Sequence, residues 1–86
     1  MASRRKHSEA HARAQLTQRY DGRVSWSQLR ERVDRGEYEY VARQTGTRSL
    51  CKCVVGAEDV WFILNRKEQS VVTVLTPEMA ADARMM

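Results

Sequence analysis

The stretch EYEYVARQTGTRSLCKCVVGAEDVWFILNRKEQSVVTVLT, residues 37–76, decides the fold because it holds four segments with the patterns of β-strands. The first segment alternates along its length, the second is rich in β-branched residues and cysteine, and the last two are short apolar runs. The connections between them are short enough for hairpins. The sequence therefore predicts an antiparallel meander with strands at residues 37–44, 47–55, 60–65 and 70–76.

The residues before this stretch favour helix. Residues 3–20 contain neither glycine nor proline, and Ala12, Leu16 and Tyr20 recur at steps of four, which forms one apolar stripe. The sequence predicts a first helix at about residues 3–20, and the Asp-Gly pair that follows is a stop and turn signal.

A second helix is predicted at about residues 26–35. Ser25 and Gln28 have the spacing of a capping box, and Gly36 can end the helix in the left-handed conformation. Residues 77–86 are predicted to form a weak helix or a tail. The expected protein is one α+β domain over residues 1–86, with two N-terminal helices packed on one face of the four-stranded sheet.

The positive charge is concentrated in the first half of the chain. Residues 1–48 hold 11 basic and 6 acidic side chains, so their net charge is 11 − 6 = +5, whereas the remainder carries 4 − 5 = −1. Of the 15 basic residues 12 are arginine, whose planar fork suits phosphate. This pattern indicates RNA or DNA as a partner. The alternative is a solvated basic face with no ligand.

The chain has no apolar run long enough to cross a bilayer and no signal-peptide pattern at its start, which predicts a cytoplasmic protein with no membrane partner. Cys51 and Cys53 stand two apart on one predicted strand. Neighbours on one face of a strand are poorly placed for a disulfide, and a single C-x-C is at most half of a zinc site. We expect reduced thiols.

On the first predicted helix His7, His11, Gln15 and Arg19 are spaced by four and form a polar stripe. Two histidines one turn apart can bind a metal, but no convincing third ligand accompanies them, so no metal site is predicted. A histidine and an arginine on one face can instead serve RNA cleavage. The alternative is a polar surface without chemistry.

The hairpin segment RQTGTRS, residues 43–49, places two arginines and three hydroxyls around Gly46. Arg43, Thr47 and Arg48 would cluster at its tip and form a phosphate cradle. The alternative is an exposed hairpin whose arginines prevent aggregation through the sheet edge.

The first predicted strand places Tyr38, Tyr40 and Ala42 on one side. The tyrosines can stack on bases if exposed, or fill the core. Thr73 would join the site only if the sheet brings it beside the hairpin. The residues predicted to contact nucleic acid are Arg13, Gln15, Tyr38, Tyr40, Gln44 and Thr73.

Three short motifs carry a family resemblance that spans about residues 7–77. The motifs are H-A-x6-R-Y (His11, Ala12, Arg19, Tyr20), R-Q-x-x-T-R (residues 43–48) and VVTVLT (residues 71–76). They resemble small phage and prophage proteins, which are similar to the RelE-like and colicin-type ribonuclease superfamily, where helices precede a four-stranded antiparallel sheet.

The resemblance implies metal-independent cleavage without a cofactor, in which the substrate 2′-hydroxyl attacks the adjacent phosphate and gives a cyclic phosphate. It implies that His11 is the acid or base and that a threonine, Thr47 or Thr73, positions a hydroxyl. The chain departs from the pattern at Gln15, where related sequences tend to have a basic residue. The implied phosphate clamps are Arg19, Arg43 and Arg48.

The sequence thus predicts an RNA-binding protein that acts on mRNA or tRNA, a metal-independent endoribonuclease of phage or toxin type. The alternative is a small non-enzymatic inhibitor or binding module that acts on a host protein or nucleic-acid complex. Fold similarity within such a superfamily does not by itself establish activity.

Overall fold

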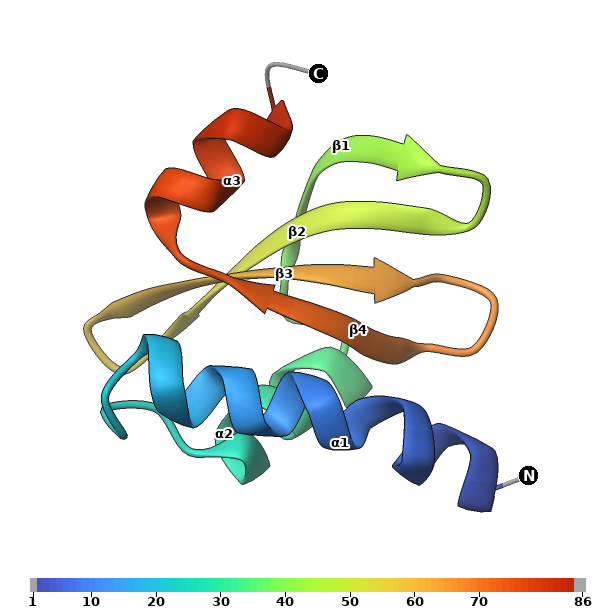
Figure 1. Cartoon of the computed structure of the whole chain (residues 1–86), viewed down its shortest axis with the longest axis horizontal. Coiled ribbons are helices and arrows are strands. Elements are labelled where there is room, and N and C mark those ends of the chain that lie inside the picture. Colours follow the sequence, from blue (N-terminus) through green and yellow to red (C-terminus); the bar gives the residue numbers. More distant parts are fainter. Residues whose placement is uncertain (1, 85–86) are drawn as a thin grey trace.

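In the computed structural model the described residues form an α+β fold with three helices and one four-stranded antiparallel sheet (Figure 1). The structure describes the backbone of residues 2–84 and the side chains of residues 9–83. The elements are α1 (Ala2–Arg19), α2 (Trp26–Asp34), β1 (Glu39–Thr45), β2 (Arg48–Val55), β3 (Glu58–Asn65), β4 (Ser70–Leu75) and α3 (Pro77–Arg84).

The helix and strand positions follow the sequence patterns, and their ends lie within two residues of the expected ones. The C-terminal segment, expected as a weak helix or a tail, is helical from Pro77 to Arg84. The hydroxyl of Thr76 accepts a hydrogen bond from the amide of Met79 at 3.2 Å, and Pro77 takes the first helical position. This cap explains why α3 begins where it does.

The strand order is β1-β2-β3-β4, and β1 pairs irregularly with β2. Tyr40 pairs with Cys51 and Ala42 with Leu50, which leaves Val41 as an extra residue between them. Paired residues share a face and neighbours on a strand do not, so this β-bulge puts Tyr40 and Ala42 on opposite faces. The expectation that they lie on one side was wrong, because strict alternation assumes a strand without bulges.

Both faces of the sheet carry buried apolar clusters. On the first face Leu16 of α1 and Leu29 of α2 lie in one cluster with Phe62 of β3. On the second face the smaller cluster joins Leu50 of β2 to Ala80 of α3. Figure 1 shows α1 and α2 on one side of the sheet and α3 on the other.

The two cysteines are free and buried in the first cluster. Burial raises the pKa of Cys51 and of Cys53 to about 11, from a usual value of 9.0. Both thiols therefore keep their protons at neutral pH and act as small apolar side chains.

The outer edge of β4 is covered by α1, which runs alongside it (Figure 1). The carboxylate of Glu9 accepts a hydrogen bond from the amide of Val71, and the side-chain oxygen of Gln15 accepts one from Val74, both at 3.0 Å. The guanidinium of Arg19 donates to the Val74 carbonyl. Side chains of α1 thus take the place of a further strand and satisfy backbone groups that an edge leaves unpaired.

Tyr20, the first residue after α1, completes this arrangement. Its hydroxyl donates to the carbonyl of Leu75 at 2.7 Å and accepts from the amide of Trp61 at 3.0 Å. The phenol therefore bridges the ends of β3 and β4. Burial raises the pKa of Tyr20, which keeps this donor protonated.

Nowhere in residues 2–84 is there a helix with the length and apolar character that crossing a membrane requires.

Candidate nucleic-acid interface

The turn between β1 and β2 and the turn between β3 and β4 lie at the same end of the sheet (Figure 1). Arg48 at the start of β2 pairs with Asn65 at the end of β3, so the two turns are neighbours. We call residues 43–48 and 65–70 together the hairpin end.

Arg66 ties the two turns to each other. Its backbone amide donates to the carbonyl of Thr47 at 2.8 Å, and its guanidinium donates to the carbonyl of Gly46 at 2.9 Å. The hairpin end is therefore one structural unit, and not two independent loops.

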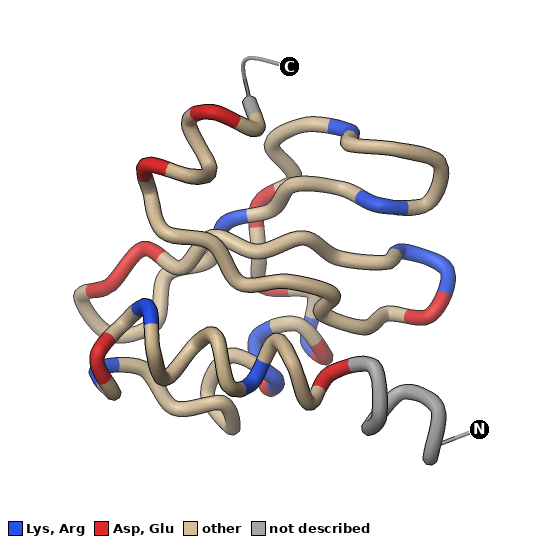
Figure 2. The backbone as a smooth tube through the Cα atoms, in the orientation of Figure 1, with Lys and Arg blue, Asp and Glu red and all other residues tan. Residues whose placement is uncertain are grey.

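The hairpin end carries an excess of positive charge. It holds four basic residues and one acidic residue, so its net charge is 4 − 1 = +3. Figure 2 shows blue in the β3–β4 turn and a blue segment on each strand beside the β1–β2 turn. Among the described side chains, Arg43, Arg48 and Lys67 form no ion pair. Exposed cations without carboxylate partners remain available to an anionic ligand.

Four other arginines of the described residues are paired with carboxylates instead. Arg30 contacts the carboxylates of Glu9 and Asp34 and also donates to the carbonyl of Gln69 at 2.9 Å. Three further pairs join an arginine to a glutamate: Arg23 with Glu58, Arg32 with Glu37 and Arg35 with Glu31.

The two arginines of the predicted cradle point to opposite faces of the sheet. Arg43 pairs with Ser49 and shares its face, whereas Arg48 is the neighbour of Ser49 on β2 and lies on the other face. Arg48 shares its face with Asn65, and Arg43 shares its face with Tyr40. The hairpin thus presents one guanidinium on each side instead of two around a single phosphate.

The two predicted stacking residues have different environments. Tyr38 packs against the first core cluster, and its ring meets Phe62 edge-on at a centroid distance of 5.9 Å. Tyr40 is 53% exposed. Only Tyr40 presents a large aromatic surface to solvent at this position, so the core interpretation fits Tyr38 and the stacking interpretation fits Tyr40.

The predicted site residues of α1 also have different environments. His11 and Arg13 are exposed, whereas Gln15 and Arg19 bind the backbone of β4. The helix α1 lies alongside β4, at one edge of the sheet, and β1 forms the other edge. Because β2 and β3 stand between them, roughly 14 Å separate the β4 edge from Arg43 on β1. The fold therefore does not unite the polar stripe of α1 with the arginine on β1.

Three remaining predicted residues lie around the second face or the tip. The side chain of Gln44 donates to the carbonyl of Ala83 in α3 at 3.4 Å. Thr73 pairs with Ile63 and is half-buried on the face that α3 partly covers. Thr47 is exposed at the tip beside Arg48.

Sequence reasoning missed Arg66 and Lys67. The available signal was a pair of adjacent cations inside the connection between the last two predicted strands. Their proximity to the other hairpin depends on the pairing of β2 with β3.

As to metal ligands, the described residues contain no group of three or more histidine, cysteine or acidic side chains that could hold an ion. The side chain of His7 lies outside the described residues.

Comparison with family models, curated proteins and solved structures found no match, so nothing in these comparisons links the chain to the RelE-like or colicin-type ribonucleases.

Proposed function

We propose that the chain binds single-stranded RNA through the hairpin end. The observation that supports this most directly is the group of cations at that end whose charges no described carboxylate balances. Affinity for a polyanion comes mainly from neutralised phosphates and the counterions that they release. Three unpaired cations and Arg66, held on one rigid end, suit such a ligand.

The two faces of the β1–β2 hairpin would contact successive parts of one strand. Arg43 and the exposed ring of Tyr40 share one face, which combines a phosphate contact with a surface for base stacking. Arg48 lies on the opposite face. A flexible strand that crosses the tip can reach both arginines, whereas a single phosphate cannot.

The same geometry favours binding over cleavage. Arg19, an implied phosphate clamp, donates to the backbone of β4, and the strand that α1 covers is at the opposite edge from β1. We therefore favour a non-enzymatic binding module. Membership of the RelE-like superfamily stays a prediction; the order of two helices followed by four antiparallel strands supports it.

The deciding experiment measures the affinity of the purified protein for a fluorescent single-stranded RNA over a range of salt concentrations. We expect Arg43→Gln, Arg48→Gln and Lys67→Gln each to weaken binding and to lower the salt slope by about 1. Arg35→Gln is the matched control. It removes the same charge, but Arg35 is paired with Glu31 and lies near Val55, at the other end of β2 from Arg48.

Equal losses in all four variants would mean that only net charge matters, and the assignment to the hairpin end would fail. No salt-dependent binding by the unmodified protein would remove RNA as the ligand and leave a host protein as the target. Incubation of the RNA with unmodified protein and with His11→Ala in EDTA tests cleavage separately. Products that disappear with His11→Ala would restore the enzymatic alternative.

A further inference from the structure

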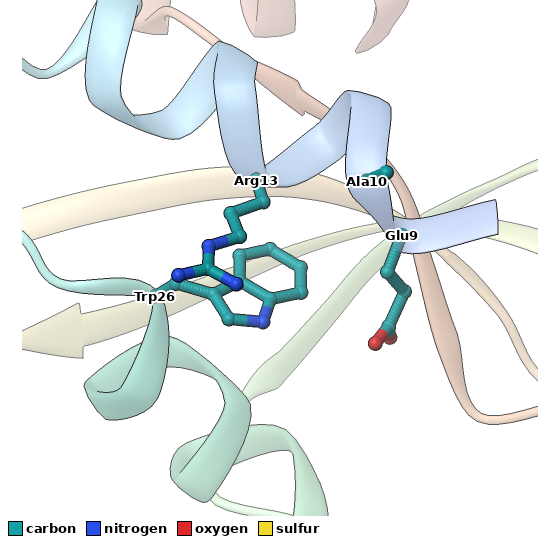
Figure 3. Close-up of a pocket in the computed structure, with 4 residues that line it drawn as sticks. All are labelled: Glu9, Ala10, Arg13 and Trp26. Carbon is teal, nitrogen blue, oxygen red and sulfur yellow. The ribbon is translucent and has the colours of Figure 1, made fainter. Parts of the chain in front are cut away.

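A second feature lies away from the hairpin end, in the helical layer. A pocket of about 440 Å³ opens between α1 and the start of α2, and the described residues that line it are Glu9, Ala10, Arg13 and Trp26 (Figure 3). This volume is in the range of pockets that hold small organic ligands. In Figure 3 the side chain of Arg13 extends from α1 toward the indole of Trp26.

The charge of the lining favours an anion. Arg13 is exposed and has neither an ion pair nor a hydrogen bond among the described residues. The carboxylate of Glu9 is bound by Arg30 and by the amide of Val71. The Glu9 carboxylate is thus engaged within the protein, and among the described lining residues the guanidinium of Arg13 is the group left to meet an anion.

The shape of the lining favours a ligand with a flat ring. Trp26 is half-buried and packs against the first core cluster, which holds the side chain in place. A fixed indole is a good stacking surface for a base, and a guanidinium nearby is a good partner for a phosphate. A nucleotide joins both groups in one small molecule.

We propose that this pocket binds a nucleotide, with its base against Trp26 and its phosphate at Arg13. The proposal rests on the proposed function in one respect, since the natural occupant would be a nucleotide of the same RNA. The pocket itself can be tested alone with free nucleoside monophosphates.

The test uses nitrogen-labelled full-length protein and proton–nitrogen correlation spectra. The chain has two tryptophans, so it gives two indole signals, and Trp61→Phe identifies the signal of Trp26. We expect a nucleoside monophosphate to shift the Trp26 signal saturably and to leave that of Trp61 unchanged. The unphosphorylated nucleoside should bind about tenfold more weakly, because the charged hydrogen bond to Arg13 is absent.

Arg13→Gln should weaken the nucleotide by a similar factor of about ten, while Arg35→Gln, an exposed arginine of the same helical layer, should leave the affinity unchanged. The spectrum of each variant also reports whether the fold is intact. Absence of a saturable shift, or equal affinity in Arg13→Gln and the unmodified protein, overturns the proposal.

The two proposals can fail independently. Salt-dependent RNA binding that needs Arg48, without a Trp26 shift by nucleotides, would reject the pocket and keep the hairpin end. A nucleotide shift that survives Arg48→Gln, with no binding of longer RNA, would keep the pocket and reject the hairpin end.

Discussion

The edge of β4 and the hairpin end both combine strand backbone with arginine side chains, yet these side chains have opposite roles. At the β4 edge the polar side chains of α1 are occupied by backbone groups, as Gln15 and Arg19 are at Val74. At the hairpin end Arg43 and Arg48 have no described partner. An arginine on a basic surface is therefore available to a ligand only where the fold supplies neither a carboxylate nor a carbonyl.

The largest effect on stability is expected at the junction of α1, α2 and the β3–β4 turn. Arg30→Met removes the guanidinium that contacts the buried carboxylate of Glu9 and the carbonyl of Gln69. We expect a loss of about 3 kcal/mol in the free energy of unfolding, measured with urea, because the buried carboxylate of Glu9 loses the guanidinium that it contacts. Arg35→Met is the control and should cost less than about 1 kcal/mol, since its ion pair is exposed. Equal losses of stability in Arg30→Met and Arg35→Met would contradict the difference between a buried and an exposed ion pair.

Next in size is the loss of the bridging hydroxyl. Tyr20→Phe leaves the amide of Trp61 and the carbonyl of Leu75 without this partner, so we expect the free energy of unfolding to fall by about 2 kcal/mol. Tyr40→Phe is the matched control, because Tyr40 is 53% exposed and its hydroxyl has no hydrogen bond among the described residues. It should change stability by less than about 0.5 kcal/mol. An unchanged free energy of unfolding in Tyr20→Phe would mean that the bridging hydroxyl contributes little to stability.

A smaller change is expected at the hairpin end. The double variant Arg43→Gln/Arg48→Gln should unfold within about 0.5 kcal/mol of the unmodified protein, because neither guanidinium has a described partner to lose. RNA affinity, measured in parallel, should fall. Marked destabilisation would indicate that these arginines are structural, like Arg30.

The smallest effect near neutral pH concerns the buried thiols. Since burial raises the pKa of Cys51 and Cys53 to about 11, the folded state holds their protons more tightly than the unfolded state does. Their contribution to stability should be constant below about pH 9 and decline as the pH rises from there toward 11. Alkylation at mildly alkaline pH should be much slower for native protein than in urea. Equally fast alkylation would argue against buried thiols.

Local patterns in the sequence predicted much of the fold. The capping box of Ser25 and Gln28 is present, with the Gln28 amide bound to the Ser25 hydroxyl at 3.1 Å and the Gln28 side chain bound back to the Ser25 amide. Such features involve residues a few positions apart, so the sequence displays them directly. The position of Arg43 and Arg48 at a hairpin tip was predictable for the same reason.

The roles of individual polar residues were less accessible. Gln15 belongs to a regular polar stripe in the sequence, yet it is buried against Val74, which lies 59 positions later. A helix pattern indicates which residues share a side, but not that this side meets the unpaired backbone of an edge strand. Arg66 presents the same difficulty, since its partners Gly46 and Thr47 belong to another hairpin.

The order of helices and strands, the hairpin tip and the excess of arginine depend on neighbouring residues and on composition, so they can be predicted from the sequence. Which arginines stay unpaired, and which face of the sheet each one occupies, depends on contacts between distant segments and becomes visible in the folded chain. The bulge at Val41 is the clearest case: it puts Arg43 on the face of Tyr40, where strict alternation would separate them. Such a bulge depends on how β1 pairs with β2, and a period-two pattern read along one strand carries no information about its partner.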